Sequence, residues 1–281
     1  LISEGTRLCG DPGLQYHSTI NRWHTCPNSG PINASNPCSE YMFIDDSACN
    51  LASLNLMKFR KDDGTFDITS FKKAIRLFII AQEIFVDNGS YPEDSIAKNS
   101  HLFRPLGLGF ANLGSLAMSL AMPYDSEQAR SLAGAISAIM TGTAYTASAE
   151  IAAIKGPFAE FEKNKEPMLK VINMHRQHAY DVPETQCPAY LRNAAKDAWD
   201  EAVDAGTKVG FRNAQTTVLA PTGTIGFMMD CDTTGIEPDI ALVKYKLLAG
   251  GGMLKLVNKT APMALDKLGY SADDIKSICD H

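Results

Sequence analysis

Short apolar runs alternate with long amphipathic segments along this chain, and this alternation is what most restricts its fold. The runs at 49–56 and 215–220 have the length and apolar content of buried strands. Apolar residues recur at helical spacing in five longer segments, 70–88, 112–121, 126–155, 159–178 and 188–205. Strands that alternate with helices build a parallel sheet covered by helices. The sequence therefore predicts an α/β fold.

The segment 70–88 shows the helical pattern most clearly, and Gly89 should end it. Its inward stripe is predicted to consist of Phe71, Ile75, Phe78, Ile79 and Gln82. Trp199 should anchor the core from a later helix. Five further segments are predicted as follows: a loop-rich start at 1–32 with a short helix near 18–24, a strand end or helix entry at 104–109, an ambiguous strand or helix at 236–248, a mobile glycine loop at 250–252, and two short helices over 253–281.

Composition excludes several classes of protein. The 281 residues are 45% hydrophobic and 21% charged with a net charge of -6, which is ordinary for a globular protein and argues against a basic nucleic-acid surface. No apolar run reaches the roughly 18 residues of a membrane span, and the first residues do not resemble a signal peptide. Seven irregularly spaced cysteines favour a reducing, cytoplasmic compartment.

The segment Asn36-Pro37-Cys38-Ser39-Glu40 is the main candidate for chemistry. If the segment is extended, Asn36, Cys38 and Glu40 point to the same side, because alternate side chains share a face. Pro37 disfavours a central strand, since it has no amide hydrogen to donate. We therefore expect a loop over 33–45 that presents an amide, a thiol and a carboxylate to a ligand.

These three groups could act together on a hydroxylated substrate. The carboxylate can accept a proton and the amide can bind a hydroxyl group. The thiol could be a nucleophile, a metal ligand, a hydrogen donor or half of a disulfide. A neighbouring carboxylate raises the pKa of a thiol, which favours a neutral thiol that exchanges a hydrogen atom. The alternative is a structural loop in which Cys38 is simply buried.

A second candidate site is the turn at 220–226, which follows the strand-like run 216–219. Pro221 ends the strand, and two glycines and two threonines then offer backbone amides and hydroxyls. Such a turn can bind phosphate, especially where a helix begins. No lysine follows Gly226, so this is not a Walker loop. The alternative is an ordinary Gly/Thr turn.

Metal binding is a weaker alternative. His24 and Cys26 are two residues apart and could bind a metal together with Cys38, although a structural pair is the simpler interpretation. No Cys-x-x-Cys pair occurs, and we assign no metal ligand. Cys231 follows the candidate phosphate turn and is interpreted as packing near it.

The motifs resemble those of a known enzyme family. NPCSE with the downstream CNLASLNL resembles the finger loop and following strand of ribonucleotide reductase large subunits. The phrases DPG, RPLGLG and LAPTGTIGFMMDCDTTGIEPDIALVKYK are similar to the class II, adenosylcobalamin-dependent enzymes. The resemblance implies a ten-stranded α/β barrel of two half-barrels with many surrounding helices. Residues 1–281 would form a single partial domain, holding the finger loop and most of the second half-barrel, with N-terminal and C-terminal parts missing.

The resemblance also implies roles for individual residues. Cys38 corresponds to the thiyl radical that removes the 3′-hydrogen, Glu40 to the general base and Asn36 to the amide that binds substrate hydroxyls. Cys49 corresponds to one of two reducing cysteines. The resemblance implies that its redox partner lies on an earlier strand. No upstream cysteine of this chain fits that position, since Cys9 and Cys26 lie too close to the loop. Substrate would contact Asn36, Pro37, Cys38, Ser39 and Glu40, and its phosphates Pro221, Thr222, Gly223, Thr224 and Ile225.

The implied partners are a ribonucleoside di- or triphosphate and a thioredoxin-type dithiol, and a homodimer is compatible with the family pattern. Two alternatives stay open. A class I large subunit would have the same thiyl loop but would receive its radical from a partner subunit. A non-catalytic nucleotide-binding fragment would keep the phosphate turn and tolerate loss of the Cys38 thiol.

Overall fold

A small parallel sheet lies at the centre of the computed structural model, which describes residues 1–280. Strand β1 (Asn50–Asn55) pairs with β2 (Leu106–Ala111) in parallel, with Asn50 opposite Leu106. The segment 215–219 extends the sheet beside β2, because Leu108 donates to the Thr216 carbonyl and accepts from the Val218 amide. The predicted α/β fold is confirmed. The described residues form no closed sheet, so a complete barrel is not seen.

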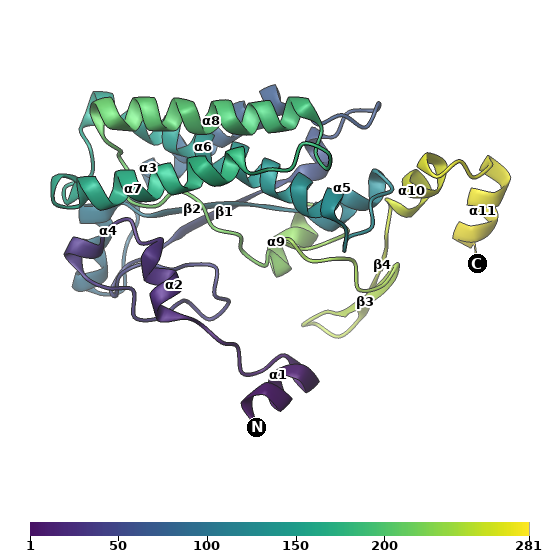
Figure 1. Cartoon of the computed structure of the whole chain (residues 1–281). Coiled ribbons are helices and arrows are strands. Elements are labelled where there is room, and N and C mark those ends of the chain that lie inside the picture. Colours follow the sequence, from purple (N-terminus) through teal and green to yellow (C-terminus); the bar gives the residue numbers. More distant parts are fainter. Residues whose placement is uncertain (281) are drawn as a thin grey trace.

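Four long helices lie on one side of this sheet (Figure 1). They are α3 (Ile68–Asn88), α6 (Glu127–Lys155), α7 (Phe161–Tyr180) and α8 (Ala189–Val209). The predicted helices over these regions, and the shorter α5 (Leu113–Ser119), are confirmed. Ser126 caps α6 by accepting the Ala129 amide, and Gly156 ends α6 with φ 83°. Trp199 is buried, as predicted.

The two faces of β2 carry side chains of very different size. Leu106, Leu108 and Phe110 are fully buried against α3 and α6, and they form the core with residues such as Ile75 and Ile136. Because side chains alternate along a strand, Gly107 and Gly109 point to the opposite face. That face is therefore almost free of side-chain bulk at β2.

One residue of the predicted stripe on α3 is misplaced. Phe71, Ile75, Ile79 and Gln82 are buried, but Phe78 is 39% exposed. The helix carries apolar residues all round, so periodicity alone did not separate its two sides.

A buried ionic cluster holds the chain segment that leads into β2. The Glu83 carboxylate accepts from Arg104 Nε at 2.6 Å and from Arg212 Nε at 2.7 Å, and its second oxygen accepts from Asn213 at 2.7 Å. Glu83 and Arg104 are both buried. The cluster joins α3 to the chain before β2 and before 215–219, and no sequence pattern had indicated it.

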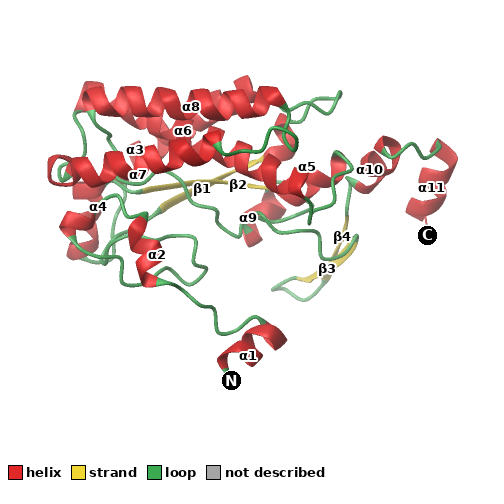
Figure 2. Ribbon diagram, viewed as in Figure 1, coloured by secondary structure: helices red, strands yellow, loops and turns green. Residues whose placement is uncertain are grey.

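Both ends of the chain lie at the edge of the molecule (Figure 2). The first 32 residues contain helices α1 (Ile2–Cys9) and α2 (His17–Arg22) and a 3₁₀ turn (Pro27–Ser29), of which only α2 was predicted. Helix α4 (Asp94–Phe103) and the 3₁₀ turn Leu56–Phe59 were also not predicted. Among residues 1–280, no helix is both long and apolar enough to cross a membrane.

The C-terminal part differs from the prediction at one element. After α9 (Gly223–Met228), strand β3 (Val243–Leu247) resolves the ambiguous segment. Strand β4 (Met253–Val257) pairs with it in antiparallel fashion, where a helix had been expected. The alternation of apolar and lysine side chains suits a hairpin closed by the three glycines. The two predicted short helices are α10 (Ala261–Lys267) and α11 (Ala272–Asp280).

Candidate active site

The thiol-bearing loop is a tight turn rather than the extended row that the sequence suggested. Ser39 donates its amide to the Asn36 carbonyl at 3.0 Å, so residues 36–39 form a β-turn. Pro37 occupies the second position, where proline is favoured, and Ser39 has φ 63°. Ser35 and Met42 pair on either side. The turn places Cys38 at an exposed tip.

Two side chains hold this turn in place. Asn36 accepts the Tyr41 amide through Oδ1 at 3.0 Å, which leaves its Nδ2 group free of any bond within the described residues. Gln15 donates from Nε2 to Ser35 Oγ at 2.7 Å and to Ser39 Oγ at 2.8 Å. Gln15 therefore links Ser35, just before the turn, to Ser39, its last residue. No sequence pattern pointed to it, because its partners lie 20 and 24 residues away.

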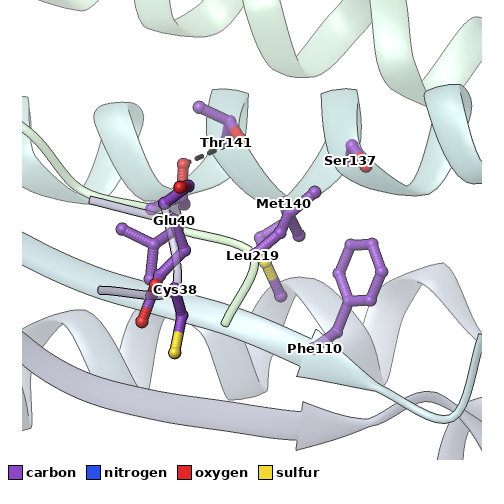
Figure 3. A pocket seen from close by; sticks show the side chains of 10 residues that line it. Cys38, Glu40, Phe110, Ser137, Met140, Thr141 and Leu219 are labelled. Atoms are coloured by element: carbon purple, nitrogen blue, oxygen red, sulfur yellow. Dashed lines mark hydrogen bonds between the residues drawn. The ribbon is translucent and has the colours of Figure 1, made fainter. Parts of the chain in front are cut away.

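A cavity of about 420 Å³ lies beside the turn. Its wall includes Cys38, Ser39 and Glu40 from the loop and 217–219 from the sheet. In Figure 3, Ser137, Met140 and Thr141 approach it from one face of α6, with Phe110 from β2. The dashed line there joins the hydroxyls of Thr141 and Thr217, 3.1 Å apart.

The Glu40 carboxylate has unused bonding capacity at this cavity. Its Oε2 atom is buried and has no hydrogen-bond partner in the described part of the chain. Buried carboxylate oxygens normally have partners, so an open one calls for an explanation. A ligand hydroxyl donating to Oε2 would satisfy it.

Cys38 also borders a second cavity, of about 700 Å³. This cavity lies between the turn and the chain before α2, and its lining includes Leu14, Gln15, Tyr16, Thr19 and Asn36. The Cys38 thiol can therefore be approached from two separate spaces.

Cys49 lies just before β1 and is packed against β2. Burial, with a smaller effect from the Glu40 charge, raises its pKa to about 12, so the thiol is neutral at pH 7. A methyl group at Gly107 would lie 2.2 Å from Cys49 Sγ. Glycine at this position is therefore what gives the sulfur its space. All seven cysteines are free thiols in the described structure.

The turn at 220–226 leads into helix α9. Thr222 precedes α9 with φ 52°, and its carbonyl accepts the Gly226 amide at 2.8 Å. The amides of 223–225 are in the first turn of α9, where the backbone lacks intrahelical acceptors. The Thr222 hydroxyl already accepts the Gly235 amide at 2.6 Å, and its O–H donor remains available to a ligand.

His24 and Cys26 behave as a structural pair. His24 Nε2 lies 2.9 Å from the Gly30 carbonyl oxygen, and its Nδ1 accepts the Cys26 amide at 3.3 Å. Burial lowers the pKa of His24 and raises that of Cys26 to about 12. No group of three His, Cys, Asp or Glu side chains within residues 1–280 is placed to hold a metal ion.

A family model described as the ribonucleotide reductase barrel domain matches residues 1–281. This chain belongs to the ribonucleotide reductase family.

Three of the relatives are named vitamin B12-dependent ribonucleotide reductase. The protein from Rhodopirellula baltica is 62% identical over 96% of this chain and 26% of its own length. Those from Streptomyces coelicolor and Agrobacterium fabrum are 50% and 51% identical over 100% and 99% of this chain, and over 30% and 23% of their own lengths. The chain thus spans between a fifth and a third of these relatives.

Proposed function

We propose that this chain is the central catalytic part of a class II ribonucleotide reductase, which converts ribonucleotides to 2′-deoxyribonucleotides with adenosylcobalamin. The relatives' names and the resemblance of the motifs support this proposal. The small parallel sheet would belong to a ten-stranded barrel, and the loop 33–45 would be the finger loop of that barrel. The seven free thiols suit a reducing cytoplasm.

The observation that carries the proposal is the position of Cys38. Its exposed thiol borders two cavities, so one can hold substrate while the other gives access to the source of the radical. When bound, adenosylcobalamin supplies the one-electron chemistry that converts this thiol to a thiyl radical. The exposure of Cys38 fits that need, because a buried thiol could not be reached from a large cofactor.

Residues of the loop would then act on the ribose. The Cys38 sulfur removes the hydrogen atom from C3′. The open Oε2 of Glu40 accepts the proton of the 3′-hydroxyl, and the free Nδ2 group of Asn36 donates to a ribose hydroxyl. Pro37 and Ser39 shape the turn that brings the three groups to the substrate.

Cys49 would supply reducing power. The 2′-hydroxyl leaves as water, and Cys49 and a second cysteine provide two electrons and two hydrogens as they close a disulfide. A thioredoxin-type dithiol then reduces that disulfide. The raised pKa of Cys49 keeps its hydrogen on sulfur until it is needed.

The phosphates would bind at Pro221–Ile225. The backbone amides of Gly223, Thr224 and Ile225 are available at the start of α9, and Ile225 is 37% exposed. The substrate is a ribonucleoside diphosphate or triphosphate.

The test uses the full-length enzyme with dithiothreitol as reductant, with and without adenosylcobalamin. Wild type should form deoxynucleotide only with the cofactor, and Cys38→Ser should form none. Cys9→Ser is the matched control, since Cys9 is also an exposed thiol but borders neither cavity. Activity that needs a second subunit would place the enzyme in class I. Activity that survives in Cys38→Ser would refute the thiyl assignment.

A further inference from the structure

A buried asparagine links the sheet to the candidate phosphate turn. Asn112 follows β2 directly, is 2% exposed and has φ 73°. Asparagine is among the few residues with a side chain that adopt this left-handed conformation readily. Glycine would meet the backbone requirement equally well, so the presence of an amide side chain calls for a role of its own.

The amide of Asn112 bridges two separate parts of the chain. Its Oδ1 accepts the backbone amide of Thr233 at 3.1 Å and the Thr233 hydroxyl at 3.3 Å. Its Nδ2 donates to Asn55 Oδ1 at 3.0 Å. Asn55 ends β1 and in turn donates to the Met229 carbonyl at 3.1 Å. Both asparagines thus hold the loop 229–237 against the end of the sheet.

The same loop supports the turn at 220–226. Gly235 donates its amide to the Thr222 hydroxyl at 2.6 Å, and Cys231 donates to the Gly226 carbonyl at 2.9 Å. Gly235 has φ 48°, and a methyl group there would lie 2.9 Å from the Ala220 carbonyl oxygen. The loop therefore packs directly on the backbone of the turn and cannot shift without moving it.

We propose that Asn112 is a positioning residue that sets the phosphate turn relative to β1, at whose start Cys49 lies. The contact runs from Asn112 through Thr233 to Gly235 and Thr222. This inference rests on the proposed function, since it assigns the turn to substrate phosphate. Asn112 itself lies away from the substrate and would act only through the loop.

The test is Asn112→Gly in the full-length enzyme. Glycine keeps the left-handed backbone and removes the amide, which leaves the buried Thr233 amide without its acceptor. We expect nucleotide affinity to fall by about tenfold, the equivalent of roughly one lost hydrogen bond. Affinity for the corresponding nucleoside, which has no phosphate, should change by less than about twofold. In the reductase assay, KM should rise while kcat stays nearly constant.

Asn164→Ala is the matched control. Asn164 is also a fully buried asparagine, and its amide bonds to Asn28, Ser29 and Glu160, none of which touches the turn. The Asn164→Ala enzyme should have the same ratio of nucleotide affinity to nucleoside affinity as the wild-type enzyme. If Asn112→Gly does not fold, Thr233→Val is the second variant. It removes the hydroxyl that donates to Asn112 and accepts from Ser115, and it keeps the bond from the Thr233 amide to Asn112, so the same loss in the ratio of nucleotide to nucleoside affinity is expected at a smaller size.

The outcomes separate this inference from the proposed function. A variant that folds, reduces ribonucleotides and keeps the wild-type ratio of nucleotide to nucleoside affinity overturns the role of Asn112 alone. Equal loss of nucleotide and nucleoside affinity also overturns it, because it would show general damage. A wild-type enzyme that neither binds nor reduces ribonucleotides overturns the proposed function and this inference together.

Discussion

Replacing Gly107 with alanine tests how the structure makes room for the Cys49 thiol. The added methyl would lie 2.2 Å from Cys49 Sγ and 3.0 Å from both Leu51 Cδ2 and Val218 Cγ2. The first distance is far inside van der Waals contact, so either the sulfur or β2 must move. The displaced group is the thiol that we assign to the reducing pair.

The size of the effect follows from two opposing contributions. Overpacking a well-filled interior costs about 1–3 kcal/mol. Replacing glycine by alanine lowers the conformational entropy of the unfolded chain, which stabilises the folded state by about 0.4–1 kcal/mol. The 2.2 Å approach places Gly107→Ala at the upper end of the first range. We therefore expect a net loss of about 2–2.6 kcal/mol in the free energy of unfolding.

A double-mutant cycle with Cys49→Ala isolates the contact. Removing the sulfur leaves space for the new methyl, so the double variant should be more stable than the sum of the single changes by about 1–3 kcal/mol. Stability is measured by denaturant unfolding. Gly134→Ala is the control, because Gly134 lies inside α6 with nothing within 4 Å of the added methyl. That change should stabilise by about 0.5–1 kcal/mol. Strictly additive effects at 107 and 49 would refute the reasoning.

Three further predictions concern buried ionisable groups. Glu83→Gln should lower the free energy of unfolding by about 3–5 kcal/mol in denaturant titrations, since Arg104 and Arg212 lose the carboxylate that they share. The control is Glu150→Gln, which breaks an exposed ion pair and should lower that free energy by under about 1 kcal/mol. Burial lowers the pKa of His175 from 6.5 to about 4, so the unfolded chain binds the proton first. Stability should fall as the pH drops from 6.5 through about 4, and His175→Phe should flatten that decline in urea midpoints. The pKa of Cys49 is raised from 9.0 to about 12, so it should resist iodoacetamide at pH 8, as followed by mass spectrometry, and stability should fall as the pH rises from 9 towards 12.

Patterns that depend on neighbours in sequence were read correctly. The helix end at Gly89 and the long helix over 126–155 follow from local sequence patterns, and the structure has both. These features require no knowledge of the rest of the fold.

Features that depend on distant contacts were missed or misread. Periodicity could not show that Phe78 faces outward, because α3 is apolar on both sides. The Asn36–Glu40 segment alternates like a strand, yet Pro37 and the Asn36–Ser39 hydrogen bond make it a turn. Gln15 and Asn112 gain their roles from partners far along the chain. The need for glycine at 107 appears only once Cys49 lies against it.

The most direct test of the central claim follows the 3′-hydrogen of the substrate. Single-turnover reduction of a 3′-deuterated ribonucleotide by the full-length enzyme should be slower than reduction of the unlabelled substrate. The reason is that the Cys38 thiyl radical must break the bond between C3′ and its hydrogen. A Gly134→Ala enzyme should show the same isotope effect, and Cys38→Ser should give no product with either substrate. Equal rates for the two substrates, with product still formed by Cys38→Ser, would contradict the account.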